Sequence, residues 1–157
     1  MKPTVSDRRL LGDVVTWLSN DIDPNTPAGL CEALRTGAEI CLTGAKKLDA
    51  SSPRWDLPDR QILAFHALEL ALKAFLAKHG VTRETLRNKP YGHDLDRLYS
   101  EAVQCGLSLP PPSKELIAAV NEYHRAHIIR YEFATTRIVP TCATLFPIVE
   151  AILAACK

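Results

Sequence analysis

Apolar residues recur along most of the chain at intervals of three and four positions, which is the spacing of an amphipathic helix. No alternating strand pattern of any length accompanies them. The pattern predicts helices at about residues 6–18, 28–48, 59–79, 94–105, 113–133 and from 140 onward. Because the connections are short, we expect an all-α fold: an antiparallel up-and-down bundle of five to six helices forming one domain over 1–157, with 1–27 as N-terminal helix and loop.

Turn residues mark several of the expected helix ends. Gly80 and Gly106 follow apolar runs and predict C-terminal stops. Thr82 is expected to cap a short turn, and Ser113 is expected to be the N-cap of the helix at 113–133. Pro140 is expected to open the last helix, with a kink or a later start at Pro147.

The helix expected at 59–79 is apolar around most of its circumference, which indicates a central position in the bundle. Three polar residues interrupt it: His66, Glu69 and Lys73. They fall within one sector of about 60°, and their spacings of three and four let neighbours touch. This predicts either a ladder of side-chain pairs facing solvent or a polar seam that reaches into a cleft or a subunit contact.

The helix expected at 113–133 also carries polar residues on the face that its apolar spacing predicts to be buried. Leu116, Tyr123 and Tyr131 line its apolar face, and His127 lies within about 20° of Leu116 on the helical wheel. Arg130 stands at the edge of that face. In one interpretation, His127 is a core histidine that hydrogen-bonds to a carbonyl, and Arg130 packs its aliphatic stem on the apolar face with its guanidinium in water. In the other, both residues line a functional groove, where the imidazole exchanges protons and the guanidinium binds phosphate.

The amino-acid composition excludes several classes of protein. The 157 residues are 46% hydrophobic and 24% charged, with a formal net charge of +1, so the chain is an ordinary globular protein without the field of a strongly basic nucleic-acid binder. Any nucleic-acid contact is expected to be local. The chain shows no signal-peptide pattern and no apolar run of about 20 residues, so we expect no membrane contact and a cytoplasmic location.

The sequence contains few motifs for metal binding, phosphate binding or catalysis. The five cysteines do not form a metal-ligand or paired pattern, and we expect them to be reduced core residues. There is no ligand set at zinc spacing, no Gly-rich phosphate loop and no evident nucleophile with its base. The sequence therefore predicts no metal site and no cofactor.

Three segments, taken in order, resemble the HEPN family of small helical-bundle proteins. The first is FHALELALKAFL at 65–76, the second is Gly92-His93-Asp94-Leu95 and the third comprises Tyr123 and Arg130-Tyr131. The resemblance covers roughly residues 60–132 and implies an antiparallel helical bundle that is commonly a homodimer. It implies binding of a nucleotide, RNA or a partner protein without efficient catalysis. The implied binding residues are His66, Glu69, Lys73, His93, Asp94, Tyr123, His127, Arg130 and Tyr131.

An alternative implied by the same resemblance is a metal-independent ribonuclease of a toxin or defence system. Catalytic members carry an Arg, then four to six residues, then a His on a late helix, for phosphate stabilisation and proton transfer. Here that spacing occurs as Arg60–His66 and Arg87–His93, outside the late helix. The catalytic candidates would therefore be displaced: Arg130 with a histidine among His93, His124 and His127. A third alternative is a purely structural dimerisation module.

Overall fold

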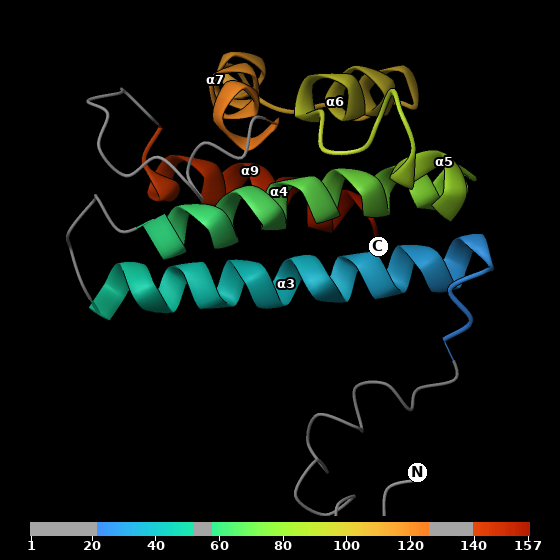
Figure 1. Ribbon diagram of the computed structural model, residues 1–157, viewed down its shortest axis with the longest axis horizontal. Coiled ribbons are helices and arrows are strands. Elements are labelled where there is room, and N and C mark those ends of the chain that lie inside the picture. The colour runs from blue at the N-terminus through green and yellow to red at the C-terminus, as the bar shows by residue number, and fades with distance from the viewer. Residues whose placement is uncertain (1–21, 52–57, 126–139) are drawn as a thin grey trace, which may run out of the picture.

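The computed structural model describes residues 22–51, 58–125 and 140–157, and every regular element in these ranges is a helix (Figure 1). An all-α fold is thus confirmed for this part of the chain. The helix expected at 6–18 and the end of the helix expected at 113–133 lie outside the described residues. The helices are α3 (Pro27–Ser51), α4 (Pro58–Lys78), α5 (Arg83–Arg87), α6 (Leu95–Gln104), α7 (Ser113–Arg125) and α9 (Cys142–Ala155).

Helix α4 is the centre of the described structure, as its apolar pattern predicts. It contacts α3, α6, α7 and α9, and it lies between α3 and the α6–α7 pair (Figure 1). Its side chains from Phe65 through Leu76 are almost all buried. A helix that is covered on several sides needs apolar residues all round, so a polar residue in it must find a partner inside the protein.

Helices α3 and α4 pack closely because α3 has glycines at the contact. A Cβ atom placed on Gly37 would lie 3.2 Å from Leu70 Cδ1, and one on Gly44 would lie 3.2 Å from Leu63 Cδ1. The later glycine faces the earlier leucine, so the two helices are antiparallel. The absence of side chains at Gly37 and Gly44 makes room for the leucines.

Most predicted helix ends are confirmed. Gly80 and Gly106 have φ angles of +89° and +96°, a conformation that glycine adopts readily. Thr82 caps α5, its hydroxyl accepting from the Thr85 amide. The Ser113 prediction was wrong by one residue: Ser113 is already helical, and its hydroxyl donates to the Pro110 carbonyl at 2.5 Å.

The last helix begins at Cys142, two residues later than expected, and Pro147 lies inside it. Burial of Leu145, Val149 and Ile152 holds α9 in the bundle. None of the helices in the described ranges is both long and apolar enough to cross a membrane.

None of the five cysteines, all of which lie in the described ranges, forms a disulfide; Cys31, Cys142 and Cys156 are buried, whereas Cys41 and Cys105 are half-buried. Burial raises the pKa of Cys156 to about 12. Desolvation disfavours the thiolate at this position, so Cys156 is a packing residue at neutral pH.

Candidate functional site

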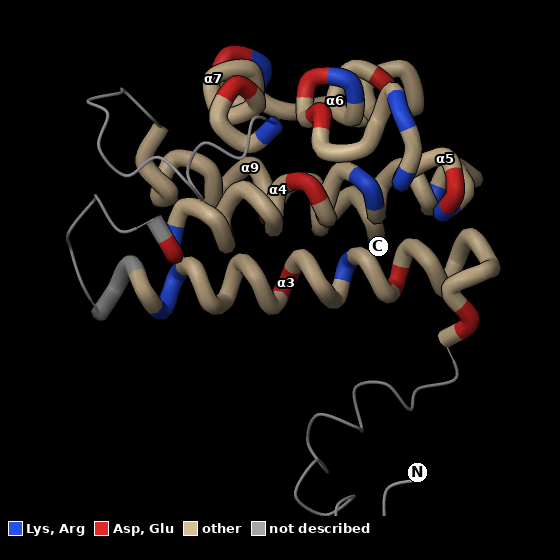
Figure 2. Tube along the Cα trace, viewed as in Figure 1, with Lys and Arg blue, Asp and Glu red and all other residues tan. Residues whose placement is uncertain are grey.

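The polar seam of α4 faces inward. Lys73 Nζ donates to Glu69 Oε1 at 2.6 Å, one helical turn apart. Glu69 is 2% exposed and Lys73 is 9% exposed. The interpretation of these two residues as a solvent-facing pair is therefore wrong, because α6 and α7 cover this side of α4 (Figure 1). Figure 2 shows the acidic and basic positions inside an otherwise uncharged stretch of α4.

Two histidines from distant segments complete the arrangement around Glu69. His93, in the turn before α6, donates from Nδ1 to Glu69 Oε2 at 3.0 Å. His124, in the last turn of α7, donates from Nε2 to the same oxygen at 2.5 Å. We name Glu69, Lys73, His93 and His124 the Glu69 cluster. Three separate segments of the chain thus converge on one carboxylate.

The Glu69 carboxylate is ionised despite its burial. Burial alone would raise its pKa, and this is the largest single influence on the group. The hydrogen bond from His124, the charge of Lys73 and the hydrogen bond from His93 together outweigh burial and hold the pKa of Glu69 well below its usual range. An ionised carboxylate can only accept hydrogen bonds, so both imidazoles turn an N–H group toward it.

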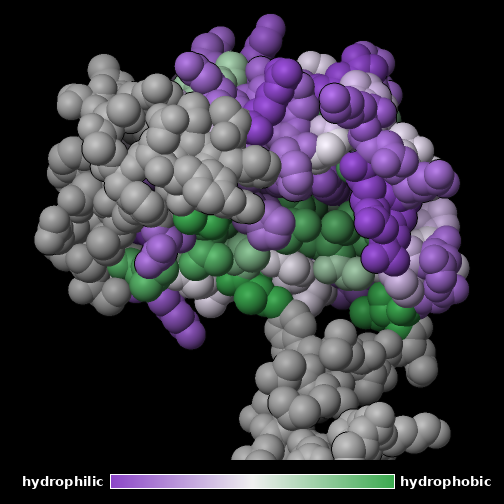
Figure 3. Space-filling model, in the orientation of Figure 1, coloured by the Kyte–Doolittle hydropathy of each residue, from purple (hydrophilic) through white to green (hydrophobic). Residues whose placement is uncertain are grey.

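The two imidazoles have different surroundings. The His124 side chain is 8% exposed, and its ring meets the buried Phe65 ring edge to face, with centroids 6.3 Å apart. The His93 side chain is 52% exposed, and its ring centroid lies 6.0 Å from that of His124. The Glu69 cluster therefore has a buried interior and one imidazole at the surface. The surface above α5, α6 and α7 is mostly hydrophilic (Figure 3).

Asn121 fixes the two histidine-bearing segments relative to each other. Its Oδ1 accepts from the backbone amide of Leu95 at 2.7 Å, and its Nδ2 donates to Asp94 Oδ1 at 3.1 Å and to Asp96 Oδ2 at 2.9 Å. Asp94, which the sequence analysis placed among the binding residues, caps α6 by accepting from the Arg97 amide. Asp94 thus positions His93, which directly precedes it, and Asn121 positions His124, which lies one helical turn further along α7.

We expect Asn121→Ala to destabilise the protein by about 1–3 kcal/mol, because the buried Leu95 amide would lose its acceptor. Urea unfolding followed by circular dichroism measures the change. Asn88→Ala is the matched control, since Asn88 is exposed and its substitution is expected to change stability by at most about 0.5 kcal/mol. Equal stability of the two variants would contradict a bracing role for Asn121.

The structure brings together some of the predicted site residues. Glu69, Lys73 and His93 meet, Tyr123 packs half-buried against the core and His66 is partly buried on α4. His127, Arg130 and Tyr131 lie outside the described residues.

The sequence predicts His124 only as one of three alternative catalytic histidines and does not predict Asn121 as a site residue. A signal for His124 was available. It continues the buried stripe of Ser113, Ile117 and Val120 on α7, so its side chain points inward.

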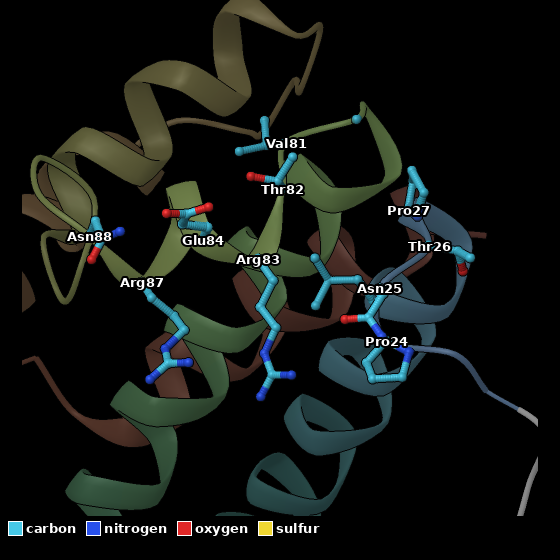
Figure 4. Close-up of a pocket in the computed structure, with 12 residues that line it drawn as sticks. Pro24, Asn25, Thr26, Pro27, Val81, Thr82, Arg83, Glu84, Arg87 and Asn88 are labelled. Carbon is cyan, nitrogen blue, oxygen red and sulfur yellow. The ribbon is translucent and has the colours of Figure 1, made fainter.

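A cavity of about 580 Å³ lies elsewhere, between the start of α3 and α5 (Figure 4). Arg83 and Arg87, one turn apart on α5, extend side by side at its edge, and Glu84 also contributes to its walls. All three side chains are exposed. The cavity thus contrasts with the Glu69 cluster, whose polar groups are held by hydrogen bonds and burial.

Comparisons with known proteins add no assignment. No family model matches this chain, and no curated protein or solved structure is significantly similar to it. The chemistry of the Glu69 cluster is therefore the basis for inferring a function.

Proposed function

We propose that the chain is a HEPN-like helical module that binds a nucleotide or RNA at the Glu69 cluster, with His93 as the side chain that meets the ligand. The observation that carries this is the position of His93: Nδ1 is held by the buried Glu69 carboxylate while 52% of the side chain is exposed. An imidazole held in this way is oriented before a ligand arrives, which lowers the entropic cost of binding.

The side chains of the Glu69 cluster indicate which chemical groups the ligand carries. With Nδ1–H of His93 directed at Glu69, Nε2 of the neutral ring accepts a hydrogen bond from a ribose hydroxyl, whereas a protonated ring donates from Nε2 to a phosphate oxygen. The formal net charge of +1 supplies no long-range attraction, so the contact is local and involves few phosphates. A nucleotide or a short single-stranded RNA fits such a site.

The HEPN-like assignment is supported by where the resembling segments meet. Glu69 and Lys73 belong to the first segment, His93 to the second, and His124 directly follows Tyr123 of the third. Segments that are weak motifs separately contribute to one hydrogen-bonded cluster. An up-and-down bundle, a homodimer and participation of Arg130 belong to the same proposal.

A second candidate function, RNA cleavage without a metal ion, is favoured by the pair of imidazoles. His93 and His124 share one carboxylate oxygen, and their ring centroids are 6.0 Å apart. His93, the exposed member of the pair, can take the proton of the ribose hydroxyl as base and return it to the leaving oxygen as acid, with the Glu69 carboxylate orienting its ring. The exposed His93 would contact the substrate, and the buried His124 would act through the cluster.

The test uses end-labelled mixed-sequence RNA and ATP as probes in EDTA, with binding followed by fluorescence anisotropy for the RNA and calorimetry for ATP. We expect the parent to bind at least one probe and His93→Gln to bind at least tenfold more weakly, since the oriented imidazole ring is lost. His79→Gln is the matched control: His79 is an exposed histidine whose Nδ1 contacts the Phe75 carbonyl, away from the cluster.

Gel analysis of the same mixtures separates the two candidates. Binding without cleavage supports the first, and cleavage that His93→Gln abolishes supports the second. His127→Ala and Arg130→Ala variants, checked for folding, test the other predicted catalytic residues. Failure of the parent to bind either probe, or equal binding by a folded His93→Gln variant, would contradict the proposal.

A further inference from the structure

We infer that Glu69, His93 and His124 form a binding site for a first-row transition-metal cation of the zinc type. Their donor atoms, one carboxylate oxygen and two imidazole nitrogens, all lie within 4.8 Å of one another. In a tetrahedral zinc site with bonds of about 2.0–2.2 Å, neighbouring donors are roughly 3.3–3.5 Å apart. Side-chain rotation supplies the donor shifts, on the order of 1 Å, that coordination needs. Each imidazole proton directed at Glu69 moves to the other ring nitrogen or to solvent, which leaves His93 Nδ1 and His124 Nε2 as lone-pair donors to the ion.

The donor types select the class of ion. Two imidazoles and a carboxylate suit zinc, cobalt, nickel and iron, whereas magnesium and calcium prefer oxygen donors throughout. Three protein donors leave at least one position for water. Among the described residues, no other group of three His, Cys, Asp or Glu side chains converges in this way.

The surroundings of the three donors match those of a half-open metal site. Glu69 and His124 form the inner part, with side chains 3% and 8% exposed. The buried Phe65 ring lies against His124 and supplies an apolar wall. His93, with 52% of its side chain exposed, borders the route from solvent.

Lys73 makes the strength of this site adjustable. Its ammonium group donates to Glu69 Oε1 and so orients the carboxylate, leaving Oε2 toward the two histidines. The same positive charge repels a divalent cation. Removing this charge while keeping an unbranched side chain, as in Lys73→Met, is therefore expected to strengthen metal binding at least tenfold.

Metal binding and the hydrogen-bonded cluster use the same three atoms, Glu69 Oε2, His93 Nδ1 and His124 Nε2. They are alternative states of one set of side chains. The metal site does not rest on the proposed function, because it needs no RNA and the RNA experiments run in EDTA. Either can fail while the other holds.

Calorimetric titration of the reduced full chain with Zn²⁺, without RNA, tests the inference, and Co²⁺ absorption reports the donor types. We expect one equivalent bound with a micromolar or tighter Kd. His93→Gln and His124→Gln should each weaken binding at least tenfold, Lys73→Met should strengthen it at least tenfold, and His79→Gln should leave it unchanged. His93 is half-exposed, so its variant tests the site even if substitution of the buried His124 impairs folding.

Three results would overturn the metal site. The first is the absence of stoichiometric Zn²⁺ binding by the parent. The second is binding that persists unchanged in a folded His93→Gln variant. The third is a Co²⁺ spectrum dominated by sulfur-to-cobalt charge transfer, which would place the ion on cysteines.

Discussion

Replacing Glu69 by Ala is expected to lower the free energy of unfolding by about 3–5 kcal/mol, the usual cost of removing one partner of a buried ion pair. The substitution leaves the Lys73 ammonium and the His124 N–H in a site that is at most 9% exposed, without the acceptor they share. Burial of an uncompensated charge, rather than loss of packing volume, dominates the effect. Urea unfolding at neutral pH measures it.

Two further variants distinguish the effect of leaving a buried charge unpaired from the effect of replacing any glutamate. Glu84→Ala removes an exposed glutamate of α5, and its stability is expected to stay within about 0.5 kcal/mol of the parent. Glu69→Leu combined with Lys73→Met removes both charges and should recover part of the loss, because an apolar pair leaves no buried ammonium group. A loss below about 1 kcal/mol for Glu69→Ala would contradict the buried network.

Leu72→Ala is expected to destabilise the protein by about 2–5 kcal/mol. Leu72 is 0% exposed in the middle of α4, the helix that contacts α3, α6, α7 and α9. Truncation removes buried methyl groups and leaves a cavity that helices packed on several sides cannot close. Thermal and urea unfolding of the full chain measure the loss.

The matched comparison for Leu72→Ala is Ile40→Ala on α3. Ile40 is 42% exposed, so its truncation is expected to cost less than about 1 kcal/mol. Similar losses for the two variants would contradict the central position of α4.

The helices were predictable because their signals are local. The spacing of apolar residues indicated α3, α4, α6 and α7, and positive-φ glycines mark the ends of α4 and α6. The central position of α4 followed from apolar residues around its circumference. The start of α7 was wrong by one residue because the hydroxyl of Ser113 bonds to the Pro110 carbonyl instead of capping the helix.

The Glu69 cluster was predictable only in part. Helical spacing placed Glu69 beside Lys73, but their burial depends on the helices that cover them. His93 and His124 lie 24 and 55 residues from Glu69 in the chain. No local pattern encodes such a contact, since it depends on how α6 and α7 cross α4. The metal donors escaped sequence analysis for the same reason.

The most direct test of the central claim, that the Glu69 cluster is the ligand-binding site, is an NMR titration of the histidine side chains. The ¹⁵N-labelled full chain is titrated in EDTA with mixed-sequence RNA and, separately, with ATP. We predict saturable shifts of the His93 imidazole resonances, smaller shifts for His124 and no change for His79. Binding that leaves His93 unmoved and perturbs Arg83 and Arg87 at the α5 cavity, or no binding of either probe, would contradict the claim.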